Sequence, residues 1–153
     1  EREPVGYYAW NRSTEKILFW SRYGFSLQLV DLQSNTARYI TGDAIPVSPQ
    51  IIPGTTNFSF VHRQGNGEVW IKELNPKTFA IRPLVMIEGA NHHYAWTPNG
   101  SILMAAGEKL NQWRPGGKWE AVADFSEYAM KSPTRVAVSP DGKKLAVVAV
   151  AGD

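Results

Sequence analysis

Short apolar runs separated by polar turns recur along the whole chain, and this pattern predicts antiparallel β-strands. The clearest unit lies at 138–149, where an apolar run leads into a Ser-Pro-Asp-Gly turn at 139–142 and a second apolar run begins at Leu145. Proline presets φ for a turn, and glycine accepts the positive φ that other residues resist. The unit therefore predicts two strands joined by a tight hairpin.

The same frame recurs upstream at a nearly constant spacing. Its anchor positions are Trp10, Ile51, Trp96 and Val138, which are separated by 41, 45 and 42 residues. Periods of this length are typical of β-propeller blades or of helical arrays, and the strand-like content favours the propeller. We therefore predict an all-β chain in which each period supplies one blade of four antiparallel strands.

The repeats divide the chain into about three and a half blades, at approximately 5–43, 44–89, 90–130 and 131–153. Closed propellers typically need ~4 to 8 blades, so this number would leave sheet faces and a strand edge uncovered. Two explanations stay open. Either the rest of the ring lies on sequence outside these residues, or a second chain supplies it.

Three local expectations follow from the strand pattern. The alternation in 25–31 predicts a third strand that includes Phe25 and places it on one side with Leu27 and Leu29. Residues 79–84 are expected to form the outer strand of the second repeat, beginning at Phe79. Residues 124–130 are expected to form either a single helical turn or a loop.

Composition narrows the class of protein. The chain is 43% hydrophobic and 20% charged, as in ordinary soluble globular proteins, and its net charge of +2 is spread rather than clustered, which argues against nucleic acid as a partner. It has no cysteine, and run 145–151 is far shorter than the ~20 residues that span a bilayer. The first residues carry neither Met nor a signal sequence, so the chain looks trimmed.

These repeats resemble the TolB-like β-propeller family, also described by its Pro-Asp repeats. The sequence Ser-Pro-Asp-Gly-Lys at 139–143 matches the family pattern, Trp-Thr-Pro-Asn-Gly at 96–100 is close to it, and Ser-Arg-Tyr-Gly at 21–24 followed by Val-Asp-Leu at 30–32 is similar to the middle of the repeat. The resemblance implies a propeller with a scaffold role in the bacterial cell envelope, and hence a periplasmic or secreted protein.

Propellers usually meet their ligands through the loops that enter the inner strand and those that join the second strand to the third. The residues that these loops collect here are Tyr7, Tyr8, Arg22, Tyr23, His62, Arg63, Asn91, His92, His93, Glu108 and Arg135. Arg22 and Arg63 each lie five residues after equivalent positions of neighbouring repeats, so their guanidinium groups could hold one carboxylate or phosphate. The alternative is that each arginine pairs within the protein.

The sequence favours neither a metal nor a catalytic nucleophile. His92 and His93 are adjacent on an expected strand and would point to opposite faces, and no acidic or Cys partner lies nearby at ligand spacing. The chain has no Gly-x-Ser-x-Gly motif. We therefore predict no cofactor and no catalytic residue. The carboxylates Asp31, Asp124 and Asp141 are expected to cap backbone amides in turns.

The six tryptophans are expected to pack. Trp10 and Trp96 should lie between blades, and Trp20, Trp70, Trp113 and Trp119 mostly in the core.

The sequence leads to a non-enzymatic binding module that presents its channel-mouth loops to a protein or peptide partner. Two alternatives stay open. The chain could be the substrate-binding or gating propeller of an enzyme, either a peptidase or a polysaccharide lyase. It could also be a half-propeller that completes its ring by self-association.

Overall fold

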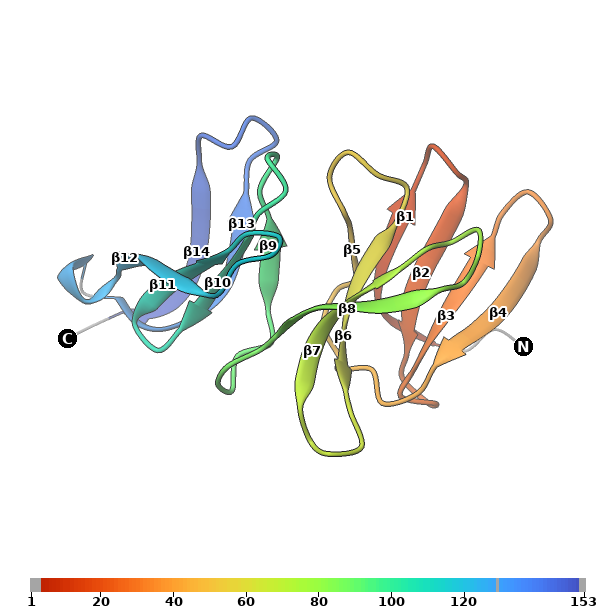
Figure 1. The fold of residues 1–153 in the computed structure, drawn as a ribbon, viewed down its shortest axis with the longest axis horizontal. Helices are drawn as coiled ribbons and strands as arrows, with labels where there is room; N and C mark the ends of the chain where they lie inside the picture. Colours follow the sequence, from red (N-terminus) through yellow and green to blue (C-terminus); the bar gives the residue numbers. More distant parts are fainter. Residues whose placement is uncertain (1–3, 129, 152–153) are drawn as a thin grey trace. The chain divides into compact units, whose positions relative to one another are not determined.

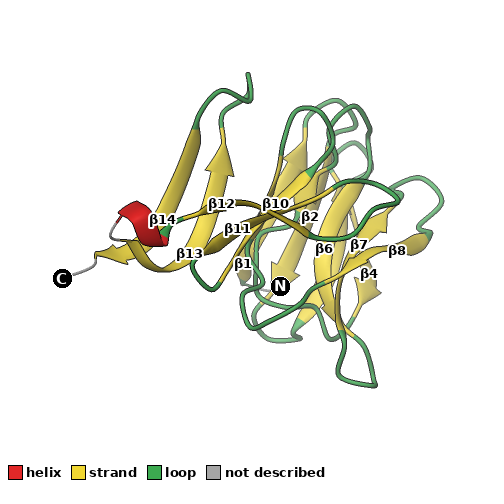
Figure 2. Cartoon of the chain, turned by 60° about the vertical axis from the view of Figure 1, so that its left-hand side comes forward, coloured by secondary structure: helices red, strands yellow, loops and turns green. Residues whose placement is uncertain are grey.

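The structure is a computed structural model that describes residues 4–128 and 130–151. Within these ranges the chain forms strands β1 to β14 and one short 3₁₀ helix, η1 (Ser126–Tyr128) (Figure 1 and Figure 2). The strands make three four-stranded sheets and one two-stranded sheet, and all pairings are antiparallel. This confirms the predicted all-β class.

Each four-stranded sheet is built from strands that follow one another in sequence. The first sheet consists of β1 (Val5–Asn11), β2 (Lys16–Ser21), β3 (Ser26–Asp31) and β4 (Thr36–Thr41). The second consists of β5 (Gln50–Ile51), β6 (Phe58–Arg63), β7 (Val69–Leu74) and β8 (Ile81–Met86). The third consists of β9 (Tyr94–Trp96), β10 (Ile102–Ala106), β11 (Lys109–Trp113) and β12 (Glu120–Asp124). The two-stranded sheet pairs β13 (Met130–Val138) with β14 (Leu145–Ala151).

The predicted Pro-Asp-Gly hairpin joins β13 to β14. Gly142 has a φ of 70°, and the Asp141 carboxylate accepts hydrogen bonds from the Ser139 hydroxyl at 2.6 Å and the Lys143 backbone N–H at 3.1 Å. The Ser139 hydroxyl, followed by the Lys143 amide, holds the pKa of Asp141 below its usual value. This confirms the capping role predicted for Asp141. Asp31 and Asp124 accept backbone N–H bonds in the same manner.

The contacts within the chain divide it into two compact units, residues 1–87 and 88–153. In the first unit, the facing sides of the first and second sheets share one core. Its buried members are Leu18, Trp20, Leu27, Leu29, Ala44, Phe58, Phe60 and Leu74. The Trp20 indole N–H donates to the backbone oxygen of Ala44 at 2.9 Å, and the Asn11 side-chain amide donates to that of Thr56 at 3.1 Å. The two sheets are therefore joined by apolar packing and by polar contacts.

In the second unit, the third sheet packs against β13. The buried residues of this core are Ala95, Leu103, Ala105, Leu110, Phe125 and Val136. Helix η1 forms the connection from β12 to β13, which decides between the two alternatives left open for residues 124–130. A Cβ atom added at Gly142 would lie 3.4 Å from the Pro98 ring, so the turns of these adjacent repeats lie close together.

The expectation for Phe25 was wrong. β3 begins at Ser26, and Phe25 lies in the preceding turn with a φ of 45° and 62% of its surface exposed. Ser21 and Ser26 pair directly, so residues 22–25 must reverse the chain, and a left-handed last residue closes such a turn. Phe79 shows the same effect, with a φ of 61°, and its strand begins at Ile81.

The tryptophan expectations are met in part. Trp20 and Trp113 are buried, at 6% and 4% exposure. Trp10 does not lie between the first and second sheets, because its neighbour Ala9 takes the core-facing position and successive strand residues point to opposite faces. Trp10 is 40% exposed, and the Arg12 guanidinium lies 4.9 Å from its ring centroid.

The indole of Trp20 provides a test of the joint between the first two sheets. We expect Trp20→Phe to lower the free energy of unfolding by about 1–3 kcal/mol, because the buried carbonyl of Ala44 loses its donor. Denaturant unfolding followed by circular dichroism measures this change. The matched variant Trp10→Phe should change stability by no more than about 0.5 kcal/mol. Equal losses in the two variants would contradict the role given to the Trp20–Ala44 bond.

Candidate functional site

Most of the predicted site residues lie at the same end of their own sheet. Because neighbouring strands run antiparallel, the start of the first strand, the end of the second and the start of the third meet at one end, which we call the loop end. In the first unit it carries the β2–β3 turn at 22–25 and the end of β6. In the second unit it carries residues 91–93, which lead into β9, and the β10–β11 turn with Glu108.

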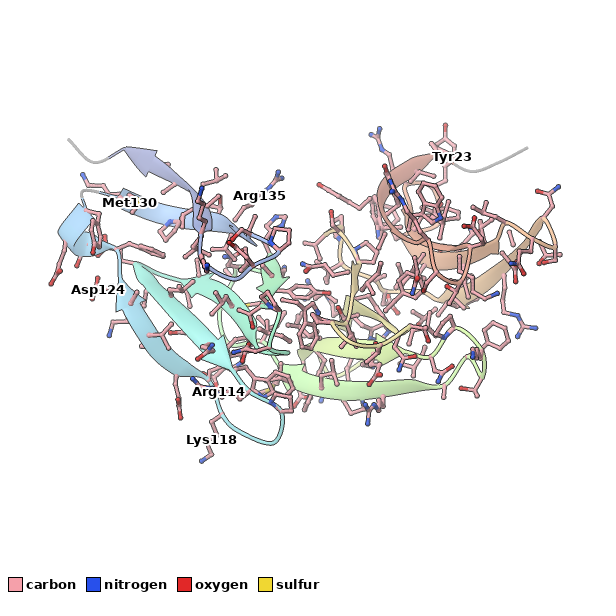
Figure 3. All side chains as sticks on the ribbon, turned by 90° about the horizontal axis from the view of Figure 1, so that it is seen from above. Tyr23, Arg114, Lys118, Asp124, Met130 and Arg135 are labelled. Atoms are coloured by element: carbon pink, nitrogen blue, oxygen red, sulfur yellow. The ribbon has the colours of Figure 1, made fainter. Side chains whose placement is uncertain are left out.

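The β2–β3 turn presents two aromatic rings and a cation to solvent. Tyr23 is 80% exposed and Phe25 is 62% exposed, and Tyr23 projects beyond the ribbon of the first sheet in Figure 3. The Arg22 guanidinium makes no hydrogen bond or ion pair with another described residue. The turn itself is held, since the backbone N–H of Arg22 donates to Pro4 at 3.1 Å.

The turn is also anchored to the core through Phe25. The ring of Phe25 meets the buried ring of Trp20 edge-on, with 5.7 Å between centroids and an interplanar angle of 77°. Trp20 also packs against Tyr7, whose ring centroid lies 6.1 Å away. Tyr8 points to the opposite face of β1 and is 62% exposed. The structure therefore separates the two neighbouring tyrosines that the sequence grouped together.

The end of β6 is held by the segment that follows β4. The backbone N–H of Arg63 donates to the backbone oxygen of Asp43 at 3.0 Å. Nε2 of His62 lies 3.3 Å from the Thr41 hydroxyl. The Arg63 guanidinium is exposed and pairs with no other described residue. Arg22 and Arg63 thus follow corresponding parts of β2 and β6, and among the described residues neither guanidinium has a hydrogen-bond or ion-pair partner.

His62 carries an unusual buried atom. Its Nδ1 is inaccessible to solvent and has no hydrogen-bond partner among the described residues. Burial lowers the pKa of His62, and the positive charge of Lys72 lowers it further, against the opposing effect of Asp43. Folding therefore favours the neutral imidazole.

In the second unit, Asn91 has a structural role. Its side-chain N–H donates to the backbone oxygen of Ala105 at 2.8 Å, and its side-chain oxygen accepts the His93 backbone N–H at 3.0 Å. The amide therefore shapes the entry into β9, and both of its polar atoms are already engaged. Glu108 is exposed, and its backbone oxygen accepts the N–H of Phe125 at 2.7 Å.

His93 and Arg135 precede equivalent anchors by three residues, and the structure places Arg135 close enough for its positive charge to act on His93. Burial lowers the pKa of His93, and the positive charges of Arg135 and then His92 lower it further. Arg135 is exposed on β13 (Figure 3). Arg135 therefore presents its positive charge beside His93, whose neutral form is favoured.

One polar cavity was missed by the sequence reasoning. It has a volume of about 310 Å³, lies at the other end of the second sheet, and is lined by Asn57, Glu73, Asn75, Thr78, Ala80 and Arg82. Glu73 is only 4% exposed and accepts hydrogen bonds from Asn57 and Arg82. The sequence signal for this site was Glu73, a carboxylate within the partly apolar strand β7. Such a side chain is rarely buried unless it is paired.

The described residues form neither a cluster of metal ligands nor a membrane-spanning helix. In the described ranges, no three His, Cys, Asp or Glu side chains lie close enough to hold a metal ion. None of the helices in those ranges has the length and apolar character needed to cross a membrane.

Comparison with known proteins shows the fold. No protein-family model and no curated protein sequence matches the chain. Among solved structures, TolB from Acinetobacter baumannii matches 99% of the chain with a TM-score of 0.75 and 21% identity. A chain of a nidogen/laminin complex matches 93% with a TM-score of 0.65 and 10% identity. The β-propeller domain of Myceliophteria thermophila Cps50 (Swd1) matches 95%, also with a TM-score of 0.65 and 10% identity.

These likenesses, together with the sheets described above, confirm the predicted β-propeller fold. The chain spans 39% of the TolB chain, 54% of the chain in the nidogen/laminin complex and 50% of the Cps50 chain. Membership of the TolB-like family and the blade boundaries remain predictions.

The contrast between Asn91 and Arg135 can be tested by stability. Asn91→Ala should lower the free energy of unfolding by about 1–3 kcal/mol, because it leaves the buried carbonyl of Ala105 without its donor. Arg135→Ala, on an exposed side chain, should stay within about 0.5 kcal/mol of the wild type. Thermal and denaturant unfolding measure both. An unchanged stability for Asn91→Ala would return its amide to the list of possible ligand-binding groups.

The two histidines predict a pH dependence of stability. Their folded-state pKa values lie below the ordinary 6.5, so the unfolded chain binds protons more readily. Their contribution is therefore complete above pH 6.5 and is lost as the pH falls through 6.5 towards the folded-state values. We therefore expect the denaturant concentration at the unfolding midpoint to decrease as the pH is lowered from about 7.5 to about 5.5.

Replacing both His62 and His93 by Gln should flatten this dependence. The carboxylates with lowered pKa values, such as Asp31 and Asp141, lose their contributions only at more acidic pH, since their ordinary value is 3.8. A double variant with the wild-type slope between pH 7.5 and 5.5 would show that other groups are responsible.

Proposed function

We propose that this chain is a non-enzymatic β-propeller module that binds a protein or peptide partner at the loop end of its first sheet. The observation that carries the proposal is the β2–β3 turn. It exposes Tyr23 and Phe25 beside an arginine, Arg22, that has no partner among the described residues. Tyrosine, phenylalanine and arginine are enriched at the centres of protein interfaces, and tyrosine and arginine are frequent hot spots.

The turn is also organised in advance of binding. Phe25 adopts a φ of 45°, which a bulky residue rarely accepts, and its edge contact with the buried Trp20 supports this conformation. A surface loop that is already fixed loses less conformational entropy when a partner binds. This favours the turn as a recognition element over an exposed segment without anchors.

The charges suggest the chemistry of the partner. Arg22 and Arg63 stand at corresponding strand ends, and each guanidinium group can donate two hydrogen bonds to one carboxylate. Tyr23 and Phe25 add exposed apolar contact area in the same turn as Arg22. The expected partner is therefore a peptide segment that carries acidic and apolar side chains. The resemblance to TolB-like propellers supports a periplasmic or secreted setting for this interaction.

Selection from a peptide library displayed on phage tests the proposal. We expect the immobilised chain to enrich peptides that combine acidic with aromatic or aliphatic residues. Tyr23→Ala and Arg22→Ala should each weaken the binding of a selected peptide by about tenfold or more, as measured by calorimetry.

Exposed residues elsewhere supply the controls. Tyr128 is 67% exposed on η1, and Arg114 lies in the exposed β11–β12 turn. Tyr128→Ala and Arg114→Ala should leave the affinity unchanged. If the selected peptides bind the turn variants as tightly as the wild type, the proposed site is wrong.

A second candidate is the substrate-binding propeller of an enzyme, which is favoured by the polar cavity of the second sheet. Its lining offers amide, hydroxyl and guanidinium groups around the buried Glu73, a set suited to a small polar ligand. Thermal-shift measurements with panels of oligosaccharides and short peptides distinguish the two candidates. A ligand whose effect is lost in Asn75→Ala but kept in Tyr23→Ala would favour this second function.

A further inference from the structure

The buried carboxylate of Glu73 departs from the repeat to which it belongs. Leu18 and Ser59 each lie eight residues after the anchor of their repeat, and they pair with Leu29 and Glu73 respectively. Glu73 is therefore the equivalent of Leu29, a core residue that is 3% exposed, and it is itself only 4% exposed. A buried carboxylate costs stability even when it is paired, whereas a leucine stabilises a core. Departures of this kind are expected at functional sites.

The two partners of Glu73 each keep unused polar atoms. The carboxylate accepts hydrogen bonds from the side-chain amide of Asn57 and from Nε of Arg82. Nη1 and Nη2 of Arg82 make no hydrogen bond with another described residue, and this side chain is 73% exposed. The side-chain oxygen of Asn57 likewise accepts no hydrogen bond from the part of the chain that the structure describes. Because both residues line the cavity, it holds unused donors and an unused acceptor next to the carboxylate.

Asn75 adds a further donor, and its counterpart in the first sheet shows why this donor is available. Its side-chain oxygen accepts the backbone N–H groups of Lys77 at 2.9 Å and Thr78 at 3.1 Å, which fixes the amide in the turn. Its side-chain N–H groups have no partner among the described residues. The equivalent residue of the first sheet, Asp31, caps its turn in the same way but also forms an ion pair with Lys16. The first sheet therefore closes this position, and the second sheet leaves it open.

We propose that this cavity binds a neutral saccharide through two adjacent hydroxyl groups. The opposite charges of Glu73 and Arg82 compensate each other, so the cavity favours neither an anion nor a cation. A hydroxyl group can both donate and accept. One hydroxyl can therefore donate to the Glu73 carboxylate, which can accept more than its two present bonds, while the adjacent hydroxyl accepts from Nη of Arg82. The oxygen of Asn57 and the N–H groups of Asn75 offer the same combination to a further hydroxyl.

The size of the cavity limits the ligand. Ligand pockets generally have volumes of about 300–1,000 Å³, and this one, at about 310 Å³, lies at the lower limit. It suits a single sugar ring rather than a longer oligosaccharide. The inference rests on the second candidate function, to which it gives a class of ligand. It is independent of the peptide-binding proposal, because it uses no residue of the β2–β3 turn.

NMR titration of the isotope-labelled chain with the methyl glycosides of glucose, galactose and mannose tests the proposal. We expect at least one of them to shift the backbone amide signals of Lys77, Thr78 and Ala80 saturably. A dissociation constant on the order of 1 mM suits so small a ligand. Inorganic phosphate and acetate should bind at least about tenfold more weakly. No saturable shift with any of the glycosides up to about 50 mM, or tighter binding of either anion, overturns the proposal.

Removal of single hydroxyl groups from the bound glycoside tests the contact itself. Among deoxy analogues that each lack one ring hydroxyl, we expect two adjacent positions at which the affinity falls by about tenfold, roughly the effect of one hydrogen bond. Equal affinity of all the analogues, or losses at positions that are not adjacent, would show that a pair of neighbouring hydroxyls is not what the cavity recognises.

Substitutions test the place of binding. Ala80 lines the cavity from an exposed position, so Ala80→Leu should fill it and abolish glycoside binding without disturbing the fold. Ala37→Leu, at an exposed position of β4, is the matched control and should leave binding unchanged. Asn75→Asp keeps the oxygen that caps the turn but removes the N–H donor, and it should weaken binding by about tenfold. Wild-type affinity in either cavity variant, with an otherwise unchanged spectrum, would place the ligand elsewhere and overturn the proposal.

The turn variant separates this inference from the peptide-binding proposal. Tyr23→Ala should bind the glycoside as the wild type does, and Asn75→Asp should bind a selected peptide as the wild type does. If no glycoside binds while a peptide is still held through Tyr23, this inference alone is wrong. If a glycoside binds in the cavity and no peptide is selected, the peptide-binding proposal alone is wrong.

Discussion

The central strands of these sheets must be covered on both faces, and the rest of the structure depends on meeting that requirement. Adjacent residues of a strand point to opposite sides, yet Leu18 and Phe19 of β2 are both buried, as are all residues from Phe58 to Val61 of β6. One face of each is covered within the first unit by the shared core around Trp20. A lone blade could not bury such a strand, which is why the fold is a repeat of stacked sheets.

Because the core is carried by the strands, the loop end is free to carry recognition. The first sheet keeps its turns away from the shared core, and the β2–β3 turn contacts that core through the ring of Phe25. The exposed groups beside it, including Tyr23 and Arg22, contribute nothing to that core. Their residue types can therefore be set by a partner rather than by packing. In propellers generally, one fold serves many functions through such loops.

The sequence predicted the features that repeat, and it missed the ones that depend on tertiary contacts. The forty-residue period and the Pro-Asp-Gly turn could be recognised because the turns require glycine. Gly142 and Gly100 have φ values of 70° and 80°, which other residues resist. Phe25 was misplaced because its aromatic side chain continues the strand alternation. Whether it belongs to the strand or the turn depends on the pairing of Ser21 with Ser26, which local pattern does not reveal.

The candidate site was predictable to a similar extent. Counting positions from the anchors grouped His93 with Arg135, and the structure places them close enough for the charge of Arg135 to lower the pKa of His93. Counting could not show that the Asn91 amide is used by Ala105, or that Asn57 and Arg82 meet Glu73, because those bonds join segments at unrelated positions of the repeat.

The order of the strands has a consequence for how the protein is made. Each complete sheet pairs only strands that are neighbours in the sequence, so its hydrogen bonds close short loops and cost little chain entropy. Such low contact order allows rapid folding, and each sheet can form soon after its own forty residues leave the ribosome. A nascent blade would then offer its apolar side to the next one as that emerges, so synthesis itself would set the sequence of assembly.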